Sequence, residues 1–499
     1  MSQIDIRGAF DGQNVFITGF TGFVGKVLTE KLLRSCSQVK HIYVLMREKK
    51  GKSIAERLEE ILSDPLFSVL EKNEPKFRHR ITPLTGDCAL PGLGLSPKER
   101  QLLVDEVGIV FHGAATVRFD EQLKVAFNIN IRGTREVLDI AREMKNLKGF
   151  IHVSTAYANC HKNEIEERLY ESPYDVKKLE DMLNTLDEDI LASIQPKLLG
   201  KWPNTYAFTK AVAEHVVHDH GRGIPRIIFR PAIVVGTDRE PVIGWTDNVY
   251  GPTGLVVGAG CGLLHSIYAD TNMTANIVPV DYLVNALITA AAAVIHDQPR
   301  NGKEEVKIYN YVSCKDNPLK WAEFKRLIEI HGKDVPPMKA VWCYFLTIHK
   351  VWITHFICIL LFHYLPALIM DSITWITRSN NPNMYQIYKK VDKYGEVLAF
   401  FATRDWQFTN QNVHELLERV PEKDREEFTF DIGKLDWSKF FYNYIRGLRV
   451  YLLKDGWETL PRAQIKWRRF VIAHQIIKYV SLLIIARLAW MIASPLFSS

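Results

Sequence analysis

The chain has 499 residues, of which 47% are hydrophobic and 24% charged, and its formal net charge is +6. This length exceeds what one compact core accommodates and the composition excludes a largely disordered chain, so we expect more than one folded domain. The basic residues are scattered without a nucleic-acid-binding motif, so no nucleic-acid partner is expected. The seven cysteines have neither disulfide-like nor metal-like spacing, which predicts a reduced intracellular protein without a metal site.

The first 300 residues alternate short β-branched runs with helical segments, the pattern of a parallel sheet covered by helices on both faces. The expected strands are short apolar runs of the buried type, at 14–18, 41–45, 109–112, 150–154 and 227–229. The expected helices are 21–35, 207–217 and 280–296. This order predicts an α/β fold with a Rossmann-type doubly wound parallel sheet.

The composition changes after residue 300, and Val335-Pro336-Pro337 marks a boundary. Residues 351–370 contain no Asp, Glu, Lys or Arg and are long enough to cross a bilayer, yet they include His355, His363 and Pro366. Two interpretations stay open for this segment: a membrane span, or a buried or interfacial helix. Residues 371–460 return to the helical pattern of a water-exposed domain.

The segment 479–499 carries Arg487 as its only charge. It has roughly the length of a membrane span, and basic residues at 466, 468, 469 and 478 precede it. The positive-inside rule places such a cluster in the cytosol. We therefore expect an anchor in an intracellular membrane, peroxisomal or endoplasmic reticulum, with the catalytic domain facing the cytosol. The chain has no Ser-Lys-Leu-type C-terminal signal, so a peroxisomal address would need another route.

A glycine loop follows the first expected strand. Gly19, Gly22 and Gly25 stand between that strand and a helix, the arrangement typical of a dinucleotide pyrophosphate site. Gly19 permits the tight turn, Gly22 lets the pyrophosphate approach the backbone, and Gly25 lets helix and strand pack closely. The helix N-terminus adds unpaired N–H groups and a positive dipole end.

The end of the second expected strand indicates which dinucleotide binds. The strand runs into Met46-Arg47, where NAD-binding proteins place an Asp or Glu for the ribose 2′-hydroxyl. An arginine at this position pairs with a 2′-phosphate, so NADPH is the expected cofactor. The competing interpretation is that Arg47 only ends a strand at the surface.

The pattern Tyr-x-x-x-Lys occurs three times, beginning at Tyr174, Tyr206 and Tyr385. Only Tyr206–Lys210 follows a strand ending in Ser154-Thr155 and precedes another expected strand, so we expect it to be the catalytic pair. The two side chains lie one helical turn apart, on the same face.

The residue types suit proton transfer to a carbonyl oxygen. A free phenol has a pKa of about 10, and a neighbouring ammonium is expected to bring that pKa closer to neutrality. Lys210 is also expected to reach the nicotinamide ribose. The hydroxyl of Ser154 or Thr155 is expected to bond to the substrate oxygen; capping of a strand end is the alternative for these two hydroxyls.

Five segments together resemble the extended short-chain dehydrogenase/reductases: Thr18–Gly25, His112–Ala115, Asn130–Thr134, Ser154–Thr155 and Tyr206–Lys210. Three more are similar to alcohol-forming fatty acyl-CoA reductases: Phe111–Phe119, His152–Cys160 and Val278–Asp281. Residues 356–450 resemble the C-terminal helical domain of that family, also called the male-sterility domain, and the tail resembles its membrane anchor. The expected domains are an NADP-binding and acyl-CoA reductase domain at 1–300, a connecting segment at 301–355, the C-terminal helical domain at 356–450 and the anchor at 465–499.

The motifs and the resemblance imply two sets of site residues. The implied cofactor contacts are Thr18, Gly19, Thr21, Gly22, Phe23, Val24, Gly25, Arg47, Asp87, Ala114, Ala115, Lys210, Pro231 and Ile233. The implied catalytic residues are Tyr206, Lys210, Thr155 and Ser154, and Asn130 is expected to order the site as a buried polar residue. Phe20 departs from the family pattern of a small residue, so its ring either crowds the pyrophosphate or points to solvent.

The leading hypothesis for function is NADPH-dependent reduction of long-chain fatty acyl-CoA to fatty alcohol, with release of CoA and two hydride transfers via an aldehyde. The alternatives are another extended short-chain reductase, sterol-type or aldehyde-releasing, and a non-catalytic NADP-sensing membrane protein. The expected partners are the acyl-CoA substrate and the lipid membrane. Acyl chain length and oligomeric state have no signal in the sequence.

Overall fold

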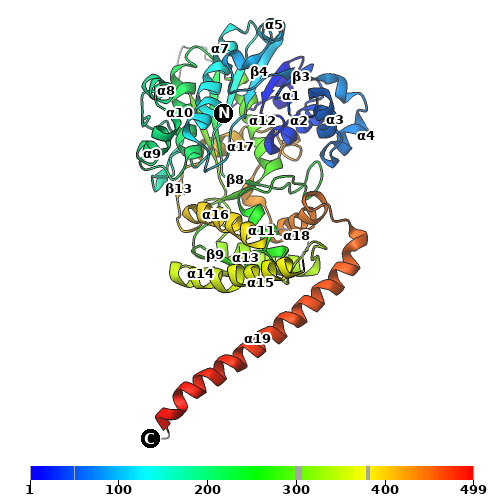
Figure 1. The fold of residues 1–499 in the computed structure, drawn as a ribbon. Helices are drawn as coiled ribbons and strands as arrows, with labels where there is room; N and C mark the ends of the chain where they lie inside the picture. Colours follow the sequence, from blue (N-terminus) through cyan, green and yellow to red (C-terminus); the bar gives the residue numbers. More distant parts are fainter. Residues whose placement is uncertain (1, 50, 298–305, 378–382, 498–499) are drawn as a thin grey trace. The chain divides into compact units, whose positions relative to one another are not determined.

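The computed structural model describes residues 2–49, 51–297, 306–377 and 383–497. A seven-stranded sheet lies at the centre of one compact unit (Figure 1). Its neighbouring strands are all parallel, and their order is β11 (Lys307–Tyr311), β7 (Arg226–Pro231), β5 (Gly149–Val153), β4 (Val107–His112), β1 (Asn14–Thr18), β2 (His41–Met46) and β3 (Ile81–Thr85). The expected Rossmann-type doubly wound sheet is confirmed.

The five expected strands are all in this sheet, and its other two strands, β3 and β11, were not predicted from the sequence. These two strands form the edges of the sheet. β3 contains Pro83 and has half-exposed positions, and β11 begins with Lys307. Edge strands tolerate proline and polar side chains, so they lack the continuous apolar run by which central strands are recognised.

Helices cover both faces of the sheet. On one face α12 (Val280–His296) contacts β5 and β7 and packs against α1 (Ile6–Phe10) and α2 (Phe23–Ser35). On the other face α7 (Gly133–Glu143) lies between α5 (Pro97–Glu106) and α10 (Thr205–Asp219). α12 is apolar nearly all round because it is buried over most of its length between strands and helices.

The two compact units alternate along the chain. The first comprises residues 1–246, 274–319 and 404–440, and the second comprises 247–273, 320–403 and 441–499. The late stretch 404–440 belongs to the first unit because β13 (Gln407–Phe408) pairs with β6 (Glu164–Ile165) and α17 (Gln411–Glu418) contacts β11. The four consecutive domains expected from the sequence are defined by family resemblance and not by spatial contacts, so they remain a prediction.

The second unit is mainly helical, with one short parallel pair, β9 (Ser266–Tyr268) and β12 (Thr347–His349). Its helices are α11 (Pro252–Gly260), α13 (Trp321–Asp334), α14 (Trp352–Ile359), α15 (Leu365–Ile376), α16 (Met384–Ala402), most of α18 (Trp437–Gly447) and α19 (Leu460–Phe497). A π-helical turn, Leu360–Tyr364, joins α14 to α15. The remaining helices, in the first unit, are α3 (Ile54–Leu62), α4 (Ser68–Asn73), α6 (Leu123–Phe127), α8 (Val176–Thr185) and α9 (Glu188–Leu199).

Among the residues that the structure describes, two helices of the second unit are long and apolar enough to cross a membrane, by length and composition: Trp352–Ile376 and Trp457–Met491. The first corresponds to residues 351–370 of the sequence analysis. The second is most of α19, which Figure 1 draws as one long helix ending at the C-terminus. The last two residues of the expected anchor, 498–499, lie outside the described residues.

Candidate active site

The glycine loop joins β1 to α2 where the strand order of the sheet reverses, the position at which doubly wound sheets bind ligands. Gly19 has φ +83°, and a Cβ there would lie 2.7 Å from the backbone nitrogen of Ala114. A Cβ on Gly25 would meet the carbonyl oxygen of Gly19. No side chain caps α2 at Gly22, so its first N–H groups and positive dipole end are directed at the loop. This cradle fits a pyrophosphate.

A buried hydrogen-bond network ties β1 to β4 behind this loop. The Thr18 hydroxyl lies 2.7 Å from His112 Nδ1 and accepts from the Ala114 N–H at 3.3 Å. His112 Nε2 lies 2.9 Å from the Thr134 hydroxyl, which itself donates to the Asn130 carbonyl. Burial lowers the pKa of His112 to about 3, so the ring is neutral and donates from Nε2. Thr18 is thus almost fully buried, and its hydroxyl holds the loop in place through this network.

The other loop residues surround the start of α2. The ring of Phe23 stacks on Trp245, with centroids 5.6 Å apart, and fixes the first turn of the helix. Thr21 and Val24 are partly exposed there. Phe20 is fully buried, so its ring does not point to solvent.

Arg47 and Asp87 lie together at the carboxyl edge of the sheet. Arg47 follows β2, Asp87 follows β3, and Nη1 of the arginine is 3.4 Å from Oδ2 of the aspartate. The Arg47 side chain is 67% exposed. A guanidinium held loosely at this edge is accessible to an anionic group beyond β2.

The remaining implied cofactor contacts follow β4 and β7. Ala114 and Ala115 come directly after Gly113 and are partly buried. Pro231 ends β7, and its carbonyl accepts a hydrogen bond from the Ala156 N–H at 2.9 Å. Ile233 lies in the short strand β8 (Ile233–Val235), which pairs with β10 (Ile277–Pro279). The structure therefore brings these residues to one edge of the sheet.

Tyr206 lies in the first turn of α10, and the side chain of Thr155, just beyond β5, is close enough to its phenol to influence the phenol pKa. Its ring stacks on Phe119 with centroids 5.8 Å apart. Burial raises the pKa of Tyr206 to about 12, and the Thr155 hydroxyl opposes that rise. The expected lowering of this pKa is not found, because Lys210 is turned elsewhere.

Lys210 lies one turn further along α10 and is almost fully buried. Its Nζ donates to the carbonyl of Val153 at 2.7 Å. Burial lowers the pKa of Lys210 to about 8, against the opposing effect of the Glu214 carboxylate. The side chain is therefore a mostly protonated ammonium at neutral pH, placed beside the strand that carries Thr155.

The sequence left open which of two adjacent hydroxyls faces Tyr206. Thr155 does, whereas Ser154 donates to Glu214 Oε1 at 2.6 Å. Glu214 also forms a fully buried ion pair with Arg230, at 2.6 Å. Sequence reasoning missed both charged residues. A glutamate on an otherwise apolar helix, four residues after Lys210, was the available signal.

Asn130 is buried as expected, in the π-helical turn Asn128–Arg132. Its amide oxygen accepts from the Thr116 N–H at 2.9 Å, and its Nδ2 donates to the Thr209 hydroxyl at 2.9 Å. Thr209 is on α10, next to Lys210. Asn130 therefore connects the segment after β4 to the helix that carries Tyr206 and Lys210.

The other two Tyr-x-x-x-Lys patterns lie in different surroundings. Tyr174 precedes α8 and packs edge-on against Phe208, with centroids 5.9 Å apart. Tyr385 belongs to the second unit, and Lys389 Nζ lies 5.3 Å from the centre of its ring. Neither pattern directly follows a strand of the central sheet.

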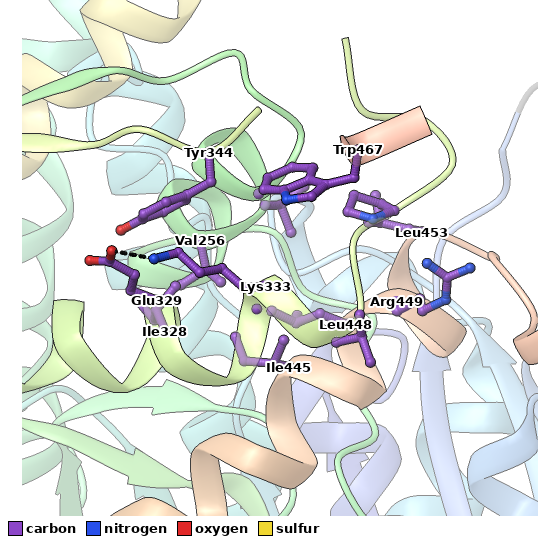
Figure 2. Close-up of a pocket in the computed structure, with 15 residues that line it drawn as sticks. Val256, Ile328, Glu329, Lys333, Tyr344, Ile445, Leu448, Arg449, Leu453 and Trp467 are labelled. Carbon is purple, nitrogen blue, oxygen red and sulfur yellow. Dashed lines mark hydrogen bonds and ion pairs between the residues drawn. The ribbon is translucent and has the colours of Figure 1, made fainter. Parts of the chain in front are cut away.

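A separate pocket lies within the second unit (Figure 2). Its empty volume, open mouth included, is about 520 Å³. Figure 2 shows mainly apolar walls, with the ion pair of Glu329 and Lys333 on the side of Tyr344. The labelled apolar lining residues are Val256, Ile328, Ile445, Leu448, Leu453 and Trp467. Within the described residues, the lining contains none of the implied site residues.

Known proteins match this chain over most of its length. Two family models, each described as male sterility protein, match residues 17–287 and 362–455. The chain is 42% identical to fatty acyl-CoA reductase wat of Drosophila melanogaster and 37% identical to fatty acyl-CoA reductase 1 of Homo sapiens, each match covering 93% of this chain and 89% of the relative. The reductase domain of a nonribosomal peptide synthetase from Mycobacterium tuberculosis has a similar fold, with a TM-score of 0.58, 15% identity, and coverage of 89% of this chain and 95% of that one.

Proposed function

Because the chain belongs to the fatty acyl-CoA reductase family, we propose that it reduces long-chain fatty acyl-CoA to fatty alcohol with NADPH, releasing CoA. The observation that carries this proposal is the placement of the Thr155 hydroxyl near the phenol of Tyr206, with Lys210 one helical turn further along α10 and its ammonium on the Val153 carbonyl. A cofactor-sensing protein has no use for a phenol arranged in this way. A fatty product partitions into the membrane, and an apolar tail in the same membrane would keep the protein close to that product.

The binding of the cofactor is assigned to residues at the carboxyl edge of the sheet. Gly19, Gly22 and the N-terminus of α2 would hold the pyrophosphate, and Arg47 would pair with the 2′-phosphate. The bound nicotinamide supplies the hydride in each of two reductions, thioester to aldehyde with loss of CoA and aldehyde to alcohol. A nicotinamide cofactor is common to the fold, and the preference for NADPH rests on Arg47.

The chain's own residues would act on the substrate oxygen. Thr155 and Tyr206 present two hydroxyls to it, and Tyr206 donates the proton that converts the developing oxyanion to a hydroxyl. The buried ammonium of Lys210 donates to the Val153 carbonyl and not to the phenol, so its proposed role is to hold the strand end that leads to Thr155 and to contact the nicotinamide ribose. Ser154, tied to Glu214, would act as a positioning residue that fixes the strand end carrying Thr155.

No covalent acyl-enzyme is proposed. Five of the cysteines are buried, and burial raises the pKa of Cys36, Cys88 and Cys160 to about 12, so these thiols are not ionised at neutral pH. A thiolate nucleophile needs a lowered pKa and exposure, and these residues have neither. Alkylation of cysteines should accordingly trap no acylated protein.

The proposal is tested by incubating membranes that carry the protein with NADPH and a panel of acyl-CoAs, and analysing the lipid products. Two NADPH should be consumed for each alcohol formed. Tyr206→Phe should abolish reduction of both acyl-CoA and aldehyde while NADPH binding persists. Tyr174→Phe and Tyr385→Phe, in the other two Tyr-x-x-x-Lys patterns, are matched controls that should keep activity.

Two results would contradict the proposal. Near wild-type reduction by Tyr206→Phe would remove the phenol from the chemistry. Free aldehyde as the main product would indicate a reductase that stops after one hydride.

A further inference from the structure

The helix formed by α14, the π-helical turn and α15 (Trp352–Ile376) has its histidines and Asp371 on the side facing the protein. Its outward side is apolar except for Thr354 and Ser372, whose hydroxyls donate to backbone carbonyls of the same segment. We propose that this outward face lies in the surface layer of a lipid bilayer, without crossing it, as a second membrane contact besides α19. We define the outward face by these exposed apolar side chains: Trp352, Ile353, Ile357, Leu361, Leu365, Leu368, Ile369, Ile373, Trp375 and Ile376.

The inward side of this helix is polar and fully engaged with the second unit. His355 Nδ1 lies 2.7 Å from the Ser266 hydroxyl of β9. His363 is fully buried, with Nε2 accepting from the His265 N–H at 3.0 Å and Nδ1 2.9 Å from Asp392 of α16.

Further along, Asp371 accepts hydrogen bonds from the Met384 and Tyr385 N–H groups at 2.7 and 2.9 Å. These contacts recur from residue 355 to residue 371, so the helix is attached to its unit along most of its length. A helix held in this way does not separate from the unit to enter the membrane alone.

The outward face has the opposite character. Leu361 and Ile369 are 50% and 53% exposed, and Trp375 is 81% exposed. A water-exposed helix normally turns its apolar stripe inward and its polar stripe outward. An apolar outward face of this extent marks an interaction surface. Tryptophans near both ends of the helix suit the interfacial region of a bilayer, where their rings are favoured.

Crossing the bilayer is disfavoured by the neighbouring helix. α15 packs against α16, which exposes Lys389, Lys390 and Glu396. Carrying α15 through the hydrocarbon core would take these charges with it, which is unfavourable because charged side chains are poorly solvated there. An orientation parallel to the surface buries the apolar face about 5–10 Å deep and leaves α16 in water.

A chain of aromatic contacts links the outward-facing helix to α19, and this link is the reason for choosing lipid as the molecule that covers the outward face. Phe362, in the π-helical turn, packs on Phe345 with centroids 5.3 Å apart. Phe345 in turn packs on His474 of α19 at 4.8 Å. His474 precedes the apolar segment 479–499 by five residues. The point where α19 would enter a membrane is therefore connected, through one side chain, to the outward-facing helix.

The test uses the full chain with its two partly exposed cysteines replaced, Cys314→Ser and Cys358→Ser, which leaves five buried thiols. A nitroxide is attached to Ile369→Cys or Ile373→Cys on the outward face, and to Ile330→Cys on α13 as a control of similar exposure in the same unit. The protein is reconstituted in phosphatidylcholine/phosphatidylserine vesicles. We expect collisions with O2 to exceed those with a water-soluble nickel chelate at 369 and 373, and the order to reverse at 330.

Whether the helix crosses the bilayer is measured separately, with single cysteines placed before its first residue and after its last. Lys350→Cys and Gln386→Cys should react at similar rates with a membrane-impermeant maleimide on sealed vesicles. Labelling of only one of them would show a span and overturn the proposal. Collisions dominated by the nickel chelate at both outward positions would show that the face is in water, and would also overturn the proposal. Spin–spin broadening at these positions would show that a second copy of the chain covers the face, with the same consequence. Retained NADPH binding shows that each variant is folded.

Discussion

The hydroxyl of Ser154 lies 2.6 Å from a carboxylate oxygen of Glu214, whereas its neighbour Thr155 acts on the phenol of Tyr206. Adjacent residues of an extended segment point to opposite sides, so we propose different tasks for the two hydroxyls. One faces the buried ion pair of Glu214 and Arg230, and the other faces Tyr206.

Thr155→Val and Ser154→Ala should therefore fail in different ways. Loss of the Thr155 donor should lower kcat by about two to three decades, the effect of removing one oxyanion donor, with little change in stability. Loss of the Ser154 hydroxyl should lower the free energy of unfolding by about 1–3 kcal/mol, because a buried carboxylate loses a donor. Steady-state kinetics and thermal unfolding on both variants separate the roles. The reverse pattern would exchange the two assignments.

The cofactor preference should depend on Arg47. Arg47→Ala removes a charge-assisted contact worth about 1.5–3 kcal/mol, so the KM for NADPH should rise by about one to two decades, and that for NADH much less. Lys40→Ala, an exposed residue just before the other end of β2, is a control with the same charge change. Equal effects of Arg47→Ala on both cofactors would mean that the arginine does not contact the 2′-phosphate.

Activity should fall on the alkaline side through the titration of Lys210. The pKa of this residue is lowered to about 8, so the ammonium is lost as the pH rises through that value, and kcat/KM should decline with it. Lys210→Arg keeps a charge that does not titrate, so its residual activity should lack this limb. A limb near pH 8 that persists in the arginine variant would assign it to another group.

The same titration acts on stability with the opposite sign. The pKa of Lys210 is about 8 in the folded protein and 10.5 when unperturbed, so between these values the folded state binds fewer protons than the unfolded state. This group therefore makes folding more favourable as the pH rises through that window. Thermal unfolding over the same range shows whether the loss of activity is separate from unfolding.

The orientation of the anchor is open to a protease experiment. The basic residues before the apolar tail predict that the nucleotide-binding sheet faces the cytosol. Protease added to intact organelles should then digest the first unit, and disruption of the membrane should add no further cleavage there. Full protection of that unit in intact organelles would contradict this orientation.

The central part of the fold could be predicted from the sequence because its strands are buried on both sides. β1, β4 and β7 are continuous apolar runs, and the glycines after β1 stand at a fixed place relative to strand and helix. The edge strands β3 and β11 lacked that signal. α12 was recognisable from its composition alone, since a helix buried all round carries few polar residues.

Only those parts of the site that depend on the spacing of residues along one helix could be predicted. Tyr206 and Lys210 are four residues apart on one helix, so their shared face followed from the sequence. The pairing of Glu214 with Arg230 depends on how α10 packs on β7, and the choice between Ser154 and Thr155 depends on that pair. The direction of the Tyr206 pKa was wrong for a similar reason. Burial and the position of the Lys210 ammonium, which determine it, are properties of the folded site.

The alternation of the two units along the chain has a consequence for biosynthesis. Residues 404–440 complete the first unit, yet the ribosome makes them only after most helices of the second unit. Until then β6 lacks its partner β13, and β11 lacks the cover of α17. A nonsense mutation anywhere before residue 404 would therefore leave an incomplete nucleotide-binding unit as well as a missing tail. Alleles truncated before residue 404 are therefore expected to behave as complete nulls, without release of a tail-less active enzyme.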